Sequence, residues 1–194
     1  MNADEGGDDD DFETSVAVLW GQRFARMIAE VAWFSALGEP LRASAQDEAE
    51  AYGEALGLGR IMVAVAVDWD AAGEVVELLR AGENAATENE MEAALMVAAA
   101  ENLPEDDILG LLQAVRVLAL RVVHPAAAQA AMRAGLREPE LVRAAAEAAV
   151  QACIQAALVL AAEAEEAHPF AHKYRLFEAG RWPLGVIGQT LHLF

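Results

Sequence analysis

The segment from Glu163 to Lys173 holds the densest group of side chains that could do chemistry. His168 and His172 lie four residues apart, and Glu165 lies one turn upstream. Imidazole and carboxylate groups can bind a divalent metal when helical spacing brings them to one face. Pro169 opposes this geometry, because proline favours the first turn of a helix and would leave His168 at the cap. The segment is therefore either a metal site of His168, His172 and Glu165 or a loop in which His168 caps the next helix.

A second cluster consists of Glu178, Arg181 and Trp182 near the C-terminus. Arginine and tryptophan can stack, and both are frequent at binding hot spots, so this cluster could form part of a partner-binding surface. The alternative is that Trp182 anchors a hairpin onto the helices while Arg181 and Glu178 pair at its edge. A large aromatic side chain beside a turn more often anchors than recognises, which favours the alternative.

The remaining chemical signals are weaker. Helical enzymes that hydrolyse nucleoside triphosphates hold magnesium with acids, but the acids here lack the paired-glutamate spacing of those enzymes and suit solvated helix faces. Phosphate-binding glycine loops, Gly-x-Ser-x-Gly elbows and Cys-x-x-Cys pairs are absent from the sequence. Cys153 stands alone and is interpreted as a small buried hydrophobic residue. The acidic residues compared above with the magnesium ligands of helical enzymes are Glu88, Glu92, Glu101, Asp106 and Asp107.

The elements that must position these groups centre on residues 137–168. This stretch is mostly alanine, with apolar residues on two flanks and one narrow polar line between them. Spacing of three or four residues places the polar side chains along one side of a helix, so the other sides must be covered by neighbouring helices. The stretch is therefore predicted to be the central helix of a bundle. The polar line is Glu140, Arg143, Glu147, Gln151 and Gln155.

The fold predicted around this helix is mainly α, an irregular bundle of about seven or eight helices finished by a small C-terminal β-hairpin over 181–194. Gly188 and Gln189 suit a type II′ turn in that hairpin. Residues 61–67 fit either a buried strand, which would pair with the hairpin, or the start of a helix reaching Arg80, and we favour the helix. Separate helices are expected over 105–124 and 126–134. Residues 1–12 are predicted to be a disordered acidic tail, and 13–194 a single helical domain.

Charge limits the classes of partner. The formal net charge is −19, and residues 1–13 supply seven of the 32 acidic residues, which leaves 25 against 13 basic residues. Such a field repels nucleic acid and anionic membranes and attracts basic proteins, although acidity also simply keeps an alanine-rich chain soluble. Charged and amide residues interrupt the apolar stretches before a membrane span is complete. With its single cysteine and no leader-like N-terminus, the chain is predicted to be cytoplasmic.

The predicted function is non-catalytic binding of another protein, basic in character, in the manner of an immunity, antitoxin or regulatory protein. No cofactor is expected under this hypothesis, and a homodimer could bury one flank of the central helix. The alternative is a metal-binding protein or metal-dependent hydrolase that holds a divalent metal with His168, His172 and nearby carboxylates. A third hypothesis is a ligand-binding bundle whose pocket is lined by Trp20, Phe24, Trp33 and Trp69.

Overall fold

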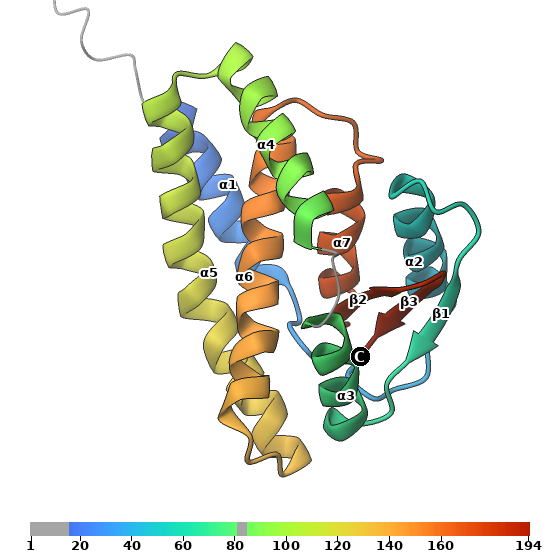
Figure 1. Cartoon of the computed structure of the whole chain (residues 1–194). Coiled ribbons are helices and arrows are strands. Elements are labelled where there is room, and N and C mark those ends of the chain that lie inside the picture. The colour runs from blue at the N-terminus through green and yellow to red at the C-terminus, as the bar shows by residue number, and fades with distance from the viewer. Residues whose placement is uncertain (1–15, 81–84) are drawn as a thin grey trace, which may run out of the picture.

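A computed structural model describes residues 16–80 and 85–194 of the chain (Figure 1). The predicted acidic tail lies outside the described residues. Those residues form seven helices and three strands, which confirms a mainly α fold with a C-terminal hairpin. The elements are α1 (Val16–Glu30), α2 (Ala43–Ala55), β1 (Met62–Val65), α3 (Trp69–Arg80), α4 (Ala85–Asn102), α5 (Glu105–Ala134), α6 (Pro139–Ala161), α7 (Pro169–Glu178), β2 (Pro183–Ile187) and β3 (Thr190–Leu193).

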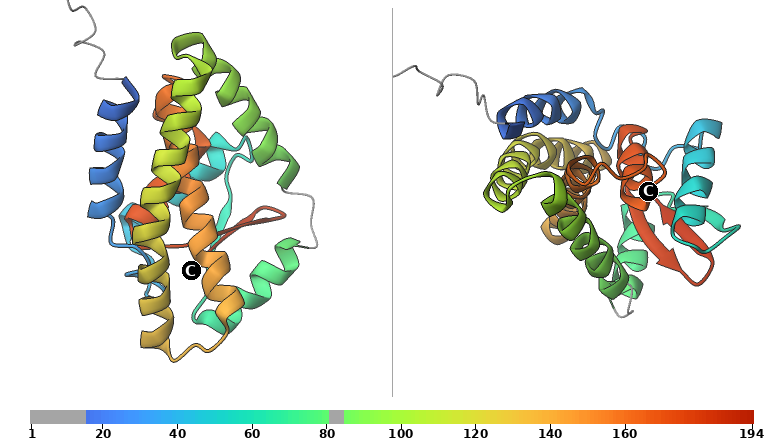
Figure 2. Two further views of the ribbon diagram at one scale, coloured as in Figure 1. Left: turned by 90° about the vertical axis from the view of Figure 1, so that its left-hand side faces the viewer. Right: turned by 90° about the horizontal axis from the view of Figure 1, so that it is seen from above.

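Helix α6 runs through the middle of the helical layer, as its two apolar flanks predict. It contacts α5 along its length and also packs against α4 and α7, while α1 lies on α5 (Figures 1 and 2). Ala145, Ala149 and Ala157 on α6 are fully buried, so neighbouring helices approach closely. Both apolar flanks of α6 are therefore covered by helices of the same chain. The predicted homodimer, in which a second subunit would cover one flank, stays a prediction. The helix ends at Ala161, seven residues before the end of the stretch 137–168 over which it was predicted.

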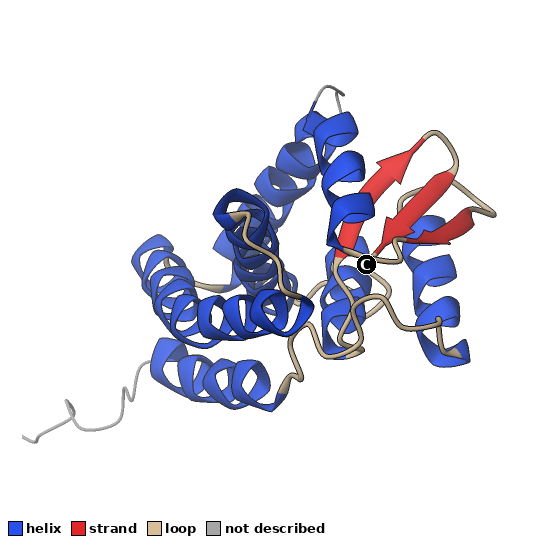
Figure 3. Cartoon of the chain, turned by 90° about the horizontal axis from the view of Figure 1, so that it is seen from below, coloured by secondary structure: helices blue, strands red, loops and turns tan. Residues whose placement is uncertain are grey.

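Residues 62–65 form a strand, so the favoured helical interpretation of 61–67 is wrong. β1 pairs in parallel with β3, in the register Met62 to Thr190 and Val65 to Leu193, and β2 pairs with β3 antiparallel (Figure 3). The ladder offered by β3 overrides a local sequence that suits either state. Gly188 has a φ of 62° and Gln189 does not have positive φ, as expected for the predicted type II′ turn.

Helix α5 continues through Pro125, so the prediction of two helices over 105–134 is also wrong. A proline removes the hydrogen bond to the carbonyl four residues earlier, here that of Arg121. Both Pro125 and Arg121 are exposed. Water can therefore satisfy the released carbonyl, which lowers the cost of keeping the helix continuous.

Two helices, α5 and α6, are long and apolar enough to cross a membrane by length and composition alone. The most apolar window of α6 is 67% buried within the fold, as expected for a core helix, whereas that of α5 is 28% buried. Core helices of globular proteins meet the same criteria of length and composition, so these two helices do not decide where the protein is located. The cytoplasmic location stays a prediction. The large apolar side chains exposed on α5 are Leu109, Val117, Leu120 and Met132.

The aromatic residues proposed to line a ligand pocket belong to packed clusters. Trp33 contacts Tyr174 and Phe177 with ring centroids 6.1 and 5.6 Å apart, and its indole N–H donates to the Ile28 carbonyl at 3.0 Å. Trp69 lies elsewhere, 5.1 Å from the Phe194 ring. Trp33 and Trp69 therefore pack against different rings and do not surround one common space, so the structure adds no support to the hypothesis of an aromatic ligand pocket.

Candidate functional site

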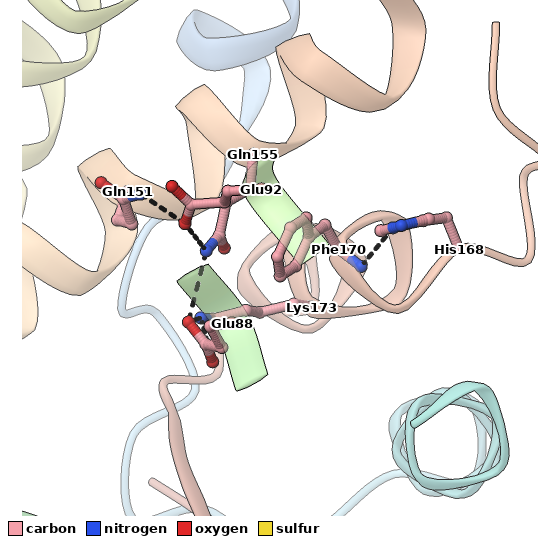
Figure 4. Close-up of polar contacts among 7 residues, drawn as sticks. All are labelled: Glu88, Glu92, Gln151, Gln155, His168, Phe170 and Lys173. Carbon is pink, nitrogen blue, oxygen red and sulfur yellow. Dashed lines mark hydrogen bonds and ion pairs between the residues drawn. The ribbon is translucent and has the colours of Figure 1, made fainter. Parts of the chain in front are cut away.

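Helix α7 places a buried lysine against the acidic start of α4 (Figure 4). The Lys173 ammonium donates to both carboxylate oxygens of Glu88 at 2.9 Å. From α6, Gln155 donates to Glu92 at 2.7 Å and to Glu88 at 3.3 Å, and Gln151 donates to Glu92 at 2.8 Å. We call these five residues the α4 network. It joins α4, α6 and α7 through side-chain hydrogen bonds.

The α4 network explains why the polar line on α6 ends in two glutamines, Gln151 and Gln155, since both donate to acids of α4. Gln155 is 0% exposed, and a buried amide needs hydrogen-bond partners because it has left water. Its amide nitrogen is paired twice, whereas its oxygen has no partner among the described residues. The sequence carried a signal for this contact, since Glu88 and Glu92 are four residues apart and share a helix face. Which helix would cover the line was not visible in the sequence.

The two histidines take separate structural roles. The imidazole Nδ1 of His168 accepts a hydrogen bond from the Phe170 N–H at 3.2 Å, so His168 is the N-cap of α7, as the loop interpretation predicted. Burial and the neighbouring His172 lower the pKa of His168, which favours the neutral ring that this cap requires. The His172 Nδ1 lies 2.6 Å from a carboxylate oxygen of Glu48 on α2.

The predicted metal ligands do not converge. Glu165 is exposed in the loop before α7. His172 uses its Nδ1 for Glu48, whose carboxylate also lies 3.6 Å from the Arg175 guanidinium. Among the described residues there is no group of three or more histidine, cysteine, aspartate or glutamate side chains that could hold a metal ion. The geometry therefore offers no support for the metal hypothesis.

The C-terminal cluster is divided between the core and the surface. Arg181 is 1% exposed and donates to the carbonyls of Glu39 and Pro40 at 2.8 and 2.7 Å. Trp182 is 2% exposed, and only Glu178 of the three is exposed. This burial argues against the predicted contact surface of Arg181 and Trp182 and agrees with the anchoring role proposed for Trp182. Arg181 instead fixes the loop after α1, a role with no sequence signal because its acceptors are backbone carbonyls.

Cys153 is fully buried on α6, and burial raises the pKa of its thiol to about 12. A thiol with such a pKa is almost entirely protonated at neutral pH, and the thiolate is the reactive form. Cys153 is thus a packed core residue, in line with its interpretation from the sequence, and supplies no nucleophile.

A groove of about 790 Å³ between α3 and the start of α6 is lined by several acidic residues. Asp70, Glu74 and Glu77 line it from α3, and Glu138 and Glu140 line it from α6. Arg80 is the one basic residue in this lining, and its guanidinium already pairs with Glu77 at 2.6 Å. We call this concavity the acidic groove. The sequence did not reveal it, because its two walls come from segments some sixty residues apart, as the printed numbering shows.

Comparison of the chain with protein-family models, curated proteins and solved structures finds no match. The class of the protein is therefore given by its own geometry: a mainly α bundle with a small mixed sheet and an acidic groove between α3 and the start of α6.

Proposed function

We propose that this protein is a non-catalytic binding protein that holds a basic segment of another protein in the acidic groove. The observation that carries the proposal is that five acidic residues from α3 and the start of α6 line one concavity with a single, already paired arginine. Opposite charges across an interface raise the association rate and exclude partners of the wrong sign. A lysine- or arginine-rich segment is the complementary occupant.

The apolar part of the groove indicates what the segment should look like. Trp69, Val76 and Leu141 contribute to the lining, and Leu78 is 64% exposed. The walls meet at Gly73, where an added Cβ would lie 3.4 Å from the Leu141 side chain. An apolar floor between charged walls suits an amphipathic segment whose apolar face enters the groove while its basic residues meet the acids.

The class of partner follows from the same charge argument. We place the protein in the cytoplasm, as an immunity, antitoxin or regulatory protein for a basic partner, with no role for nucleic acid or membrane surfaces. The net charge of −19 supports this proposal, since phosphate groups are repelled by a field of that sign. Within the described ranges 16–80 and 85–194, Glu77 is the one acidic residue of the groove that forms an ion pair, and its partner is Arg80.

Charge reversal in the groove tests this proposal. The variant Glu74→Lys/Glu140→Lys alters both walls, and Glu90→Lys/Glu101→Lys alters two exposed acids on α4 by the same total charge. The probe is a synthetic amphipathic helical peptide rich in lysine, titrated by calorimetry at low and high salt. We expect the groove variant to bind roughly tenfold more weakly or worse, and the α4 variant to lose much less.

Photo-crosslinking of the same peptide gives an independent readout of position. We expect crosslinks to fall on α3 and the first turns of α6 and to fade as salt increases, because salt screens surface charges. Equal weakening in both variants would mean that the peptide responds only to total charge, and the proposal would then be wrong. Crosslinks spread over α2 and α4 would have the same meaning.

A further inference from the structure

A second concavity, of about 490 Å³, lies beyond Arg80, is open to solvent, and is bordered by α2, α3, α4, α6 and β2. Its volume is within the range of pockets that hold small organic molecules. Most of its lining is apolar, and the bulkiest contributors are Leu56, Val76, Leu79, Met91, Trp182 and Leu184. We call it the α4 cavity. Its lining holds one acidic residue, Glu88, and one basic residue, Arg80, which is paired with Glu77.

The acidic residue, Glu88, belongs to the α4 network. Its carboxylate binds Lys173 through both oxygens, yet its side chain keeps 37% of its surface exposed and it lines the cavity. A carboxylate has about four lone-pair positions, so an additional donor can be accepted from the cavity side. Thr87, the neighbouring residue on α4, adds a hydroxyl to the same lining.

Tyr52 on α2 supplies a second polar group in the lining. It is 4% exposed and belongs to the residues that line the cavity. A phenol hydroxyl carries one donor and also accepts, so the Tyr52 oxygen can accept a hydrogen bond from a ligand. Burial and then the Glu88 charge raise the pKa of Tyr52, so the phenol stays protonated at neutral pH.

The charge balance indicates which ligand these groups would accept. The Lys173 ammonium is held by Glu88, and Glu92 adds a second carboxylate to the α4 network through Gln155. At the cavity edge Arg80 pairs with Glu77. The network thus keeps one negative charge in excess near the cavity, which disfavours an anionic ligand and favours a cationic one.

We infer that the α4 cavity is a binding site for a small molecule with a protonated amine on an apolar body. The ammonium donates to the Glu88 carboxylate and to the Tyr52 oxygen, while the apolar body lies against Trp182 and its neighbours. A charge-assisted hydrogen bond from an ammonium is stronger than a neutral one, so the amine supplies specificity and the apolar body supplies contact area. This inference does not rest on the acidic groove.

Three probes of equal length test the site: octylammonium, octanoate and octanol, each titrated into the full chain by calorimetry. We expect octylammonium to bind with one molecule per chain and at least roughly tenfold more tightly than octanol, and octanoate to bind worst. Glu88→Gln should remove the preference for octylammonium over octanol, and Tyr52→Phe should reduce it. Glu90→Gln, an exposed position on the same helix, is the matched control and should change nothing.

A cavity-filling variant separates this site from weak surface binding. Ala148 lines the cavity from α6, and Ala148→Phe should abolish binding of all three probes. Circular dichroism checks that each variant folds, and Tyr52→Phe decides the matter if Glu88→Gln does not fold. Failure of octylammonium to bind, tighter binding of octanoate, or binding unchanged in both Tyr52→Phe and Ala148→Phe would overturn the inference. None of these outcomes bears on the acidic groove.

Discussion

Gly180→Ala should lower the free energy of unfolding by about 4 kcal/mol, the largest loss that we expect from adding a single methyl group. Gly180 closes α7 with a φ of 76°, a conformation that costs an alanine about 1 kcal/mol. An added Cβ would also meet the Ser35 side chain and would lie 2.9 Å from the backbone nitrogen of Ala36. That nitrogen donates to the Gly180 carbonyl at 3.2 Å, so relief of the overlap disturbs this hydrogen bond as well.

Gly135→Ala is the matched control. Gly135 closes α5 with a φ of 73° and the same pair of backbone hydrogen bonds, from the residue itself and from the next residue to the last turn. No heavy atom lies within 4 Å of an added Cβ there, so only the conformational cost of about 1 kcal/mol should appear. Urea unfolding of both variants measures the difference. Equal losses at the two glycines would show that the contact of Gly180 with Ser35 and Ala36 contributes nothing.

Gln155→Glu should be almost as damaging at neutral pH, with a loss of about 3 kcal/mol, because it buries a third carboxylate beside Glu88 and Glu92. The new side chain would be fully buried and would lose the amide that now donates to both acids. Burial and like charges both raise the pKa of the new carboxyl in the folded state above its unfolded value near 4.3.

The pH dependence of this loss has a defined sign. Because the folded state then binds the proton more tightly than the unfolded state, stability falls as the pH rises through the interval between the two pKa values. Relative to the wild type, Gln155→Glu should therefore be less destabilised at pH 5 than at pH 7.5, by up to ~1.4 kcal/mol per pH unit within the interval. Thermal and urea unfolding at both pH values measure this change.

Two companion variants isolate the cause. Gln155→Leu removes the same hydrogen bonds without adding charge, so its loss should be nearly the same at the two pH values. Gln151→Glu adds the charge one turn away, where the side chain is only partly buried, and should cost less because water screens it. If the loss in Gln155→Glu did not change with pH, like-charge repulsion inside the α4 network would not be its cause.

The acidic groove and the α4 cavity share Val76 and Arg80 in their linings, so the two proposed sites are neighbours. The Glu77 to Arg80 ion pair lies at this shared edge, with side chains 70% and 52% exposed. An exposed pair of this kind contributes little stability. It can therefore open when a partner or ligand binds, without disturbing the packing of α3.

Local pattern alone determined the bundle and the hairpin. The period of the alanines and glutamines on α6 identified a helix covered on several sides, and the Gly188-Gln189 pair identified the turn between β2 and β3. The cap at His168 was also predictable, because Pro169 sets the backbone before the helix. These features depend on residues within a few positions of one another, which is the range over which sequence patterns carry direct structural information.

Only the tertiary structure decided the strand at 62–65 and the sites. β1 exists because β3, more than a hundred residues away in the printed sequence, offers a parallel partner. Helix α5 continues through Pro125, and Arg121, whose carbonyl loses its helical hydrogen bond there, is exposed to water. The α4 network, the acidic groove and the α4 cavity each combine side chains from distant helices. Charge and hydrogen bonding act through space, so the sequence supplied the acids and amides while the packing of α3, α4, α6 and α7 determined which of them meet.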